Sequence, residues 1–336
     1  MRKARRKTRC PTDSVWASTS ANRYSSPVGR FILSNRGLST AVGLLCAASG
    51  CEPPPLTPNG VIDVFGGVGL GPGAFSYPRA ITSAADGSIF VVDKSGRVQR
   101  FGADGEFEAL WRMPKITQGK PVGLTVHPDG RVFVADTHCH RVSIFDRDGR
   151  PLGTFGREGA GPGEFLLPTD VAIDADGFIY VSEYQGNDRI SKWSPDLRFV
   201  TSFGEAPIQG LRLSRPAGLD IDGEQTLWVA DACNHRIVRF SLDGDVLAAF
   251  GEFGPGPGQM RYPYDIAIAP DDTIMVCEYE GNRLQWFDKA GRSLRTWGRS
   301  GRNAGELFAP WGATYGPQGR VYIVDSLNSR VQVVQP

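Results

Sequence analysis

A proline recurs along the chain at a nearly fixed interval, and an acidic residue follows each copy at the same distance. The spacings between successive prolines are 43, 47, 48, 47 and 47 residues, and an Asp or Glu stands 15 residues after every one. Six identical offsets do not arise by chance, so the chain from residue 61 onward contains six copies of one unit. The repeated prolines are Pro78, Pro121, Pro168, Pro216, Pro263 and Pro310.

Each unit consists of short runs of β-branched and aromatic residues separated by turn sequences. Runs such as GLTVHP, RVFVAD and PLGTFG are typical strands, and HPDG, DADG and SLDG are typical hairpin turns. Four such strands fit in each unit of about 46 residues, and units of this kind stack radially as the blades of a β-propeller. We therefore predict an all-β fold, a six-bladed β-propeller of four-stranded blades over residues 61–336.

The two ends of the repeat region predict how the ring closes. The last unit stops after three strands, at VQVVQP, whereas VIDVFG at residues 61–66 has the form of a fourth strand with no unit of its own. We expect this N-terminal strand to complete the last blade, which would leave no long exposed edge.

An arginine follows each repeated acid by four to six residues. Because this combination occurs in every unit, and a catalytic set is not six-fold, we interpret it as a structural ion pair within each blade. The predicted pairs are Asp93 with Arg97, Asp136 with Arg141, Glu183 with Arg189, Asp231 with Arg236, Glu278 with Arg283, and Asp325 with Arg330.

The segments around these pairs resemble the NHL-repeat family. VADTHCHRV and VADACNHRI are similar to its V-A-D-x-x-N-H-R-[IV] signature, and VSEYQGNDRI, VCEYEGNRL and IVDSLNSRV follow it more loosely. The resemblance covers residues 61–336 and implies the propeller fold.

A related six-bladed class, the peptidyl-hydroxyglycine amidating lyases, places zinc-binding histidines directly after some repeat prolines. None of the equivalent residues here is a histidine, which argues against that activity, and we expect no metal and no cofactor. The equivalent residues are Arg79, Val122, Thr169, Ala217, Tyr264 and Trp311.

One end of the predicted ring collects the variable loops, and binding residues concentrate on such loops. Aromatic, basic and acidic side chains beside the prolines and the repeated acids could stack on and hydrogen-bond a polar organic ligand at the channel mouth. Alternatively, the tyrosines pack between blades. The candidate ligand-binding residues are Tyr77, Arg79, Asp170, Tyr184, Tyr264, Asp265, Tyr279 and Trp311.

Charge divides the chain into two regions. Residues 1–51 hold nine Lys or Arg and one acid, so the remainder has 37 − 9 = 28 basic and 36 − 1 = 35 acidic residues, a net charge of −7. A body with this excess of acid is poorly suited to nucleic acid or to direct contact with anionic lipid.

The run LSTAVGLLCAA, followed by Ser49, Gly50 and Cys51, resembles a bacterial lipoprotein signal peptide, which implies lipidation of Cys51. Residues 1–51 are then a basic extension and signal peptide, and residues 52–60 are a Pro-rich tether. We expect a cell-envelope protein, lipid-anchored on the extracytoplasmic side of a bacterial membrane, with plain secretion as the alternative.

We predict a binding or scaffolding module for a protein, peptide or glycan, which touches the membrane only through its anchor. An extracytoplasmic lyase or hydrolase with its site at the channel mouth is the alternative, although no catalytic constellation stands out in the sequence.

Overall fold

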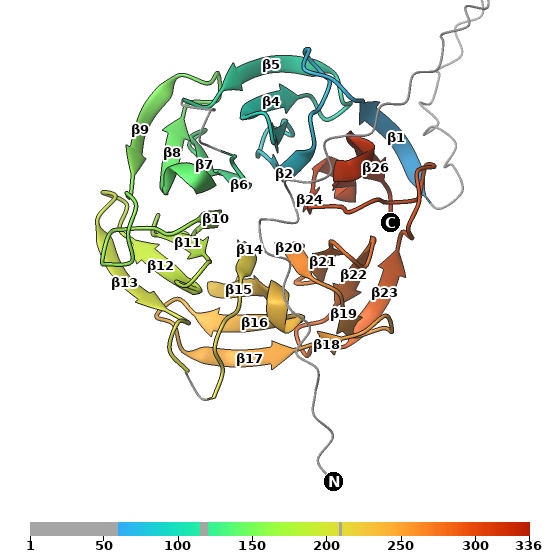
Figure 1. Ribbon diagram of the computed structural model, residues 1–336. Helices are drawn as coiled ribbons and strands as arrows, with labels where there is room; N and C mark the ends of the chain where they lie inside the picture. Colours follow the sequence, from blue (N-terminus) through green and yellow to red (C-terminus); the bar gives the residue numbers. More distant parts are fainter. Residues whose placement is uncertain (1–59, 115–119, 208–209) are drawn as a thin grey trace, which may run out of the picture. The chain divides into compact units, whose positions relative to one another are not determined.

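The computed structural model describes residues 60–114, 120–207 and 210–336, which form a ring of six four-stranded antiparallel sheets (Figure 1). This confirms the predicted six-bladed β-propeller. The predicted extension, signal peptide and tether lie outside the described residues, apart from Gly60. Within the described part, no helix is long and apolar enough to cross a membrane.

The first three blades follow one another along the chain, each running from an inner strand at the channel to an outer strand at the rim (Figure 1). Blade one comprises β2 (Pro78–Ser83), β3 (Ile89–Asp93), β4 (Arg97–Phe101) and β5 (Phe107–Arg112). Blade two comprises β6 (Gly123–Val126), β7 (Val132–Asp136), β8 (Arg141–Phe145) and β9 (Pro151–Phe155). Blade three comprises β10 (Pro168–Ile173), β11 (Ile179–Glu183), β12 (Arg189–Trp193) and β13 (Phe199–Phe203).

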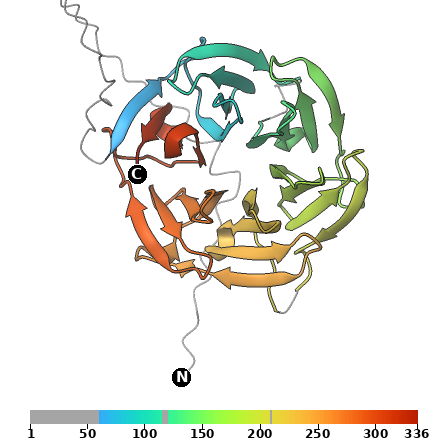
Figure 2. The same ribbon diagram turned by 180° about the vertical axis from the view of Figure 1, so that it is seen from behind.

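The last three blades complete the circle, which Figure 2 shows from the other side. Blade four comprises β14 (Pro216–Ile221), β15 (Thr226–Asp231), β16 (Arg236–Ser241) and β17 (Val246–Phe250). Blade five comprises β20 (Pro263–Ile268), β21 (Ile274–Glu278), β22 (Arg283–Phe287) and β23 (Ser293–Trp297). Blade six comprises β24 (Gly312–Tyr315), β25 (Val321–Asp325), β26 (Arg330–Val334) and β1 (Val61–Gly66).

Strand β1 is the outer strand of blade six, as the incomplete last repeat predicts. It pairs antiparallel with β26, from Val61 opposite Val334 to Gly66 opposite Arg330. The sheet order β1-β26-β25-β24 therefore joins the two ends of the repeat region and closes the ring.

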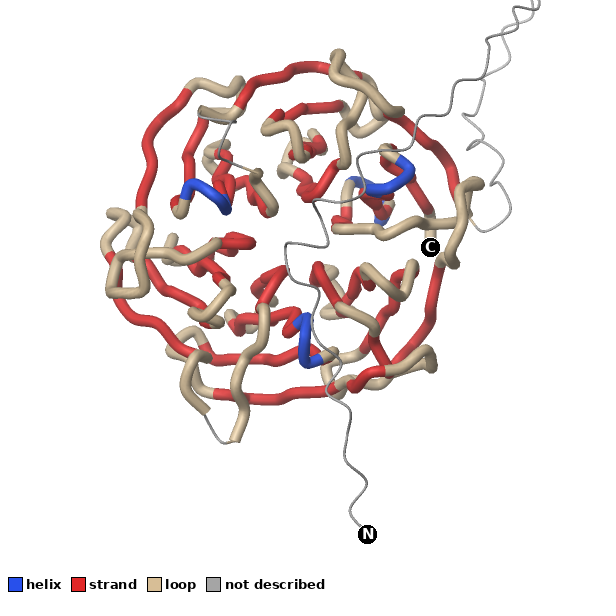
Figure 3. Tube along the Cα trace, in the orientation of Figure 1, coloured by secondary structure: helices blue, strands red, loops and turns tan. Residues whose placement is uncertain are grey.

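Little regular structure lies outside the blades (Figure 3). A short parallel pair, β18 (Glu252–Phe253) with β19 (Gln259–Met260), links blades four and five. The described helices are single 3₁₀ turns, most of them directly after the second strand of a blade. They are η2 (Thr137–Cys139), η3 (Ala232–Asn234), η4 (Pro317–Gly319) and η5 (Ser326–Asn328).

The hydrophobic core lies between adjacent blades. In β21, Met275 and Cys277 pack toward blade six, while Ile274 and Val276 pack toward blade four. Successive side chains of a strand point to opposite faces, so a strand covered by a blade on each side must be apolar at every position. This is why the second strand of each blade, such as IFVVD in β3 and IMVCE in β21, is an almost continuous apolar run.

Candidate functional site

A cavity of about 110 Å³ lies on the channel axis, lined by residues of all six inner strands. Its walls combine cationic, aromatic and carboxyl side chains with several threonines. Seven of the eight predicted ligand-binding residues come together at this cavity or in direct ring contact with it, and the eighth, Tyr184, lies under the Arg215 guanidinium.

An aromatic cluster occupies the mouth on the side of blades five, six and one. The rings of Tyr264 and Tyr279 are stacked with their centroids 4.7 Å apart, and Trp311 presents its edge to Tyr264 at 5.1 Å. Tyr77 packs on Trp311 at 5.7 Å, and its hydroxyl lies 3.3 Å from that of Tyr279. Both interpretations made from the sequence thus have a structural counterpart, because the rings pack together and also line the mouth.

Two guanidinium groups lie against these rings. Arg79 stands over Trp311 at 4.9 Å, and Arg215 stands over Tyr184 at 4.7 Å and over Tyr264 at 5.4 Å. A guanidinium placed this way gains cation–π attraction while it keeps its charge at the mouth. Sequence reasoning missed Arg215, although it occupies the same place before a repeat proline that Tyr77 does.

The backbone holds Tyr77 and Arg215 in a rarely adopted conformation. Their φ angles are +55° and +56°, in the left-handed region, and each directly precedes a proline. Residues other than glycine seldom adopt this region, and a following proline restricts the backbone further. Tyr262 and Ala309 have the same conformation before Pro263 and Pro310, so the repeat imposes it, and it fixes the backbone at the mouth.

Three carboxyl groups line the channel below the mouth, and each bridges two blades. Asp170 Oδ2 accepts the Leu219 backbone N–H at 2.9 Å, and Asp265 Oδ2 accepts that of Ala313 at 2.9 Å. Asp220, which sequence reasoning missed, accepts the Ile268 N–H at 2.7 Å. Inner strands of neighbouring blades do not pair with one another, so these carboxyl groups satisfy inward-facing N–H groups that have no sheet partner.

Glycines on the neighbouring strands make room for two of these carboxyl groups. A Cβ on Gly123 would lie 2.5 Å from Asp170 Oδ1, and one on Gly218 would lie 2.6 Å from Asp265 Oδ1. At the second position after the proline, glycine and aspartate therefore alternate from blade two to blade six, whereas blade one has Ala80 there.

Burial raises the pKa of these acids. Loss of hydration raises the pKa of Asp170 to about 7 and that of Asp220 to about 6, although backbone N–H donors favour the charged form. Burial, followed by the charge of Asp170, raises the pKa of Asp265 well above its usual value. The pKa of Asp170 thus lies near neutral pH, which is suited to acid–base chemistry.

The six repeated acids and arginines lie together in all six blades. Each acid is at most 1% exposed, and Arg Nε lies 2.8 Å from Asp231 Oδ2 in blade four and 2.7 Å from Glu278 Oε1 in blade five. Asp93 and Arg97 also pair directly. The Arg Nε to carboxylate distances are 3.0 Å for Asp136, 2.6 Å for Glu183 and 2.7 Å for Asp325.

These pairs fasten the loops that lead into each blade. Arg283 donates to the carbonyl groups of Pro255, Gly256 and Gln259, while Glu278 accepts the Arg261 backbone N–H at 2.9 Å. Arg189 and Glu183 bind the corresponding loop of blade three in the same way. None of the twelve residues lines the central cavity.

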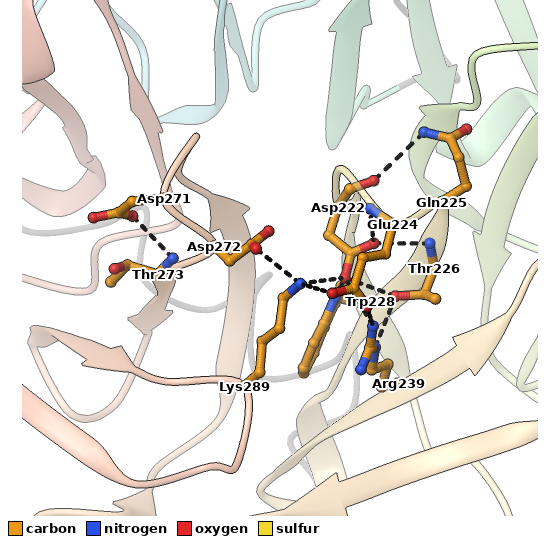
Figure 4. Close-up of polar contacts among 10 residues, drawn as sticks. All are labelled: Asp222, Glu224, Gln225, Thr226, Trp228, Arg239, Asp271, Asp272, Thr273 and Lys289. Carbon is orange, nitrogen blue, oxygen red and sulfur yellow. Dashed lines mark hydrogen bonds and ion pairs between the residues drawn. The ribbon is translucent and has the colours of Figure 1, made fainter.

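A separate polar cluster lies at the opposite end, between blades four and five. Lys289 Nζ lies 2.8 Å from Glu224 Oε1, 2.9 Å from Asp272 Oδ2 and 3.8 Å from Asp222 Oδ2 (Figure 4). Asp222 also accepts the Trp228 indole N–H at 3.0 Å. The lysine therefore ties the turn of one blade to the turn of the next.

No group of three or more His, Cys, Asp or Glu side chains in the described residues is placed to hold a metal ion. The residues directly after the repeat prolines, such as Thr169 and Tyr264, are instead engaged in packing and hydrogen bonding. The channel carboxyl groups likewise already accept backbone N–H groups from neighbouring blades.

The fold and its axial cavity define a six-bladed β-propeller with a pocket at one mouth. Residues 81–304, more than half of the chain, match the family described as the SMP-30/Gluconolactonase/LRE-like region, and the chain belongs to that family. Residues 309–334 match the NHL repeat, in agreement with the resemblance of the repeat segments.

Comparison with characterised proteins gives partial matches. The chain is 30% identical to mouse NHL repeat-containing protein 3 over 168 residues, which cover 45% of this chain and 48% of that protein. It is 37% identical to rat peptidylglycine alpha-amidating monooxygenase over 91 residues, which cover 25% of this chain and 9% of that protein. The chain thus spans less than half the length of these curated relatives.

Solved structures share the fold at low identity. A streptogramin B lyase superimposes with a TM-score of 0.60 at 16% identity, covering 81% of this chain and 97% of that one. Virginiamycin B lyase from Staphylococcus aureus superimposes with a TM-score of 0.56 at 15% identity, and the match covers 77% of this chain and 95% of that one.

Proposed function

We propose that the protein is an extracytoplasmic binding module whose channel mouth takes a protein segment, peptide or glycan. The observation that carries this proposal is the Tyr264 hydroxyl, which has no hydrogen-bond partner in the described residues although its side chain is only 4% exposed. A buried polar group left without a partner is costly, and a ligand would satisfy it.

The surroundings of Tyr264 support the same proposal. Aromatic rings offer stacking surface, the guanidinium groups of Arg79 and Arg215 offer charge, and the strained backbone of Tyr77 and Arg215 fixes the mouth before a ligand arrives. A preformed site binds with less loss of conformational entropy.

The binding test uses arrays of peptides and of oligosaccharides probed with the purified protein. Binding should be lost on Trp311→Leu and weakened on Tyr264→Phe. Trp228 is buried in the core between blades four and five, so Trp228→Phe is a control for effects on folding. Arrays that yield no ligand sensitive to Trp311→Leu would contradict the proposal.

We extend the proposal to location. Cys51 is the lipidated residue of a cell-envelope lipoprotein, supported by the small residues before it and the Pro-rich segment after it. Cys51→Ala should leave an unprocessed precursor, and globomycin should have the same effect on the native chain. A mature protein that begins elsewhere would favour plain secretion.

A second candidate is a lyase or hydrolase that uses the channel carboxyl groups. It is favoured by the pKa of Asp170, raised to about 7 by burial, because an acid that titrates near neutral pH is suited to proton transfer. Family membership with gluconolactonase-type proteins supports the same candidate.

One comparison separates the two candidates. Hydrolysis of glucono-lactone and linearisation of a streptogramin B should fall by more than about a hundredfold in Asp170→Asn if the protein is an enzyme. If it is a binding module, the native protein catalyses neither reaction and Asp170→Asn changes only the affinity for the ligand. No turnover of either compound by the native protein would favour the binding module.

A further inference from the structure

The channel carboxyl groups lack counter-charges. Asp170, Asp220 and Asp265 form no ion pair with any Lys, Arg or His side chain that the structure describes. Asp265 uses two of its lone pairs, for the N–H groups of Ile266 and Ala313, and the carboxylate keeps two more that could accept from a ligand. Burial without a cation is unfavourable for the charged form of these acids and raises their pKa, so a positive group placed between them would favour the charged form and would be bound by it.

The mouth above these acids has the opposite charge. Arg79 and Arg215 both line the cavity, and the pKa of Lys94 is lowered by burial first and by the charge of Arg79 second. Asp188 and Glu280, the acids near this mouth, do not line the cavity. A simple cation would therefore be repelled on entry.

The Tyr264 hydroxyl is an independent sign of a missing ligand. Tyr264 lines the same cavity and its ring lies beneath the Arg215 guanidinium, while its hydroxyl has no hydrogen-bond partner in the described residues. It can donate to an anionic oxygen, as the guanidinium groups can.

We propose that the cavity binds a zwitterionic group, with its ammonium between Asp170 and Asp265 and its carboxylate at Arg79, Arg215 and the Tyr264 hydroxyl. This inference rests on the proposed binding function and narrows it. The ligand is a peptide that presents an amine and a carboxylate on a slender chain, rather than a neutral glycan.

The test titrates the full-length protein with β-alanine, 4-aminobutyrate and 6-aminohexanoate by calorimetry. These zwitterions differ in the distance between their charges. Each is compared with its methyl ester, which keeps only the cation, and with its N-acetyl derivative, which keeps only the anion. At least one zwitterion should bind about tenfold or more tightly than both of its singly charged analogues.

Two variants then assign the charges to the two ends of the site. Asp265→Asn should remove the preference for the zwitterion over the N-acetyl derivative, and Arg215→Met should remove its preference over the methyl ester. Asp272→Asn, at the opposite end of the ring, should change neither preference. Because Asp265 also joins two blades, its variant is interpreted only if its melting temperature shows that it is folded.

The outcomes separate this inference from the proposed function. Equal affinity for zwitterions and their analogues, or no binding of any zwitterion, would overturn the inference. The proposed function would still stand in that case if the arrays yielded a peptide or glycan whose binding depends on Trp311.

Discussion

The Asp265 carboxylate of blade five accepts the backbone N–H of Ala313, on the inner strand of blade six, at 2.9 Å. Asp170 and Asp220 make the equivalent bond to the blades that follow them. The inner strands are thus linked around the channel by side chains rather than by a continuous sheet. The same carboxyl groups that line the candidate site therefore also hold the ring together there.

Gly218→Ala should destabilise the protein. The added Cβ would lie 2.6 Å from Asp265 Oδ1 and 2.7 Å from Asp265 Cα, so the backbone of a rigid inner strand must shift. We expect a loss of about 1 to 3 kcal/mol in the free energy of unfolding, as for overpacking in other cores. Gly153→Ala is the matched control, since a Cβ there meets nothing within 4 Å and its stability should be unchanged.

Asp170 should make stability depend on pH between about 4 and 7. Because burial raises the pKa of Asp170 to about 7 in the folded protein, the folded state retains a proton that the unfolded state has already lost. The protonated Asp170 carboxyl therefore stabilises the fold at a pH below the pKa that Asp170 has in the unfolded chain. This stabilisation is lost as the pH rises toward the pKa of about 7 in the folded protein.

The measurement is the difference in melting temperature between Asp170→Asn and the native protein across this pH range. The melting temperature of the variant should rise relative to that of the native protein as pH rises, because asparagine cannot ionise. A constant difference from pH 4 to pH 8 would contradict the raised pKa.

The Asp231–Arg236 pair should stabilise blade four without contributing to the central site. Asp231 is fully buried and also accepts the Ser214 backbone N–H at 2.7 Å, so Asp231→Ala leaves a guanidinium and an N–H without their partner. We expect a loss of about 3 to 5 kcal/mol, partly recovered when Arg236→Met is added.

Asp129 and Arg131 provide an exposed control pair, 2.7 Å apart with side chains 44% and 38% exposed. Removing it should cost about 0 to 1 kcal/mol. A double-mutant cycle for Asp231 and Arg236 that shows no coupling would refute the structural role of the repeated pairs.

Lys289→Met should weaken the contact between blades four and five at the end opposite the mouth. It removes the ammonium that Glu224, Asp272 and Asp222 share, which leaves Arg239 as the cation beside Asp222 and Glu224 and leaves an excess of acid in the cluster. The melting temperature should fall, and added salt should narrow the gap to the native protein because salt screens the repulsion among the acids. Ligand binding at the mouth should be unchanged, and a loss of binding would show that the two ends are coupled.

The repeat predicted the architecture because its recurring residues stand at fixed places relative to the strands of each blade. The proline marks the start of the inner strand in four blades and lies two residues before it in blades two and six. The acid and the arginine mark the facing ends of the next two strands, and the unmatched VIDVFG run marks the closing strand. Each of these features depends on residues within one unit, or on a count of units, and both are visible in a single chain.

The site was harder to predict because it depends on contacts between units. Asp220 stands two positions further from its proline than Asp170 and Asp265 do, so it does not align with them, although it performs the same bridging role. Arg215 has the same place before its proline as Tyr77, and only the ring geometry shows that its guanidinium lies over Tyr184 and Tyr264. Both contacts depend on side-chain conformations at the boundary between two blades, which a single sequence does not show.

The pairing of β1 with β26 has a consequence for the order of assembly. Phe65 and Val331 are opposite one another although the whole repeat region separates them in the chain. A strand made at the start must wait for nearly the last strand to leave the ribosome, and contacts this distant in sequence form slowly. Five blades can stack during synthesis, but the ring stays open at one seam until β26 has been made. A nascent chain therefore exposes an unpaired β1 until then, which makes that period the one in which a chaperone is most useful.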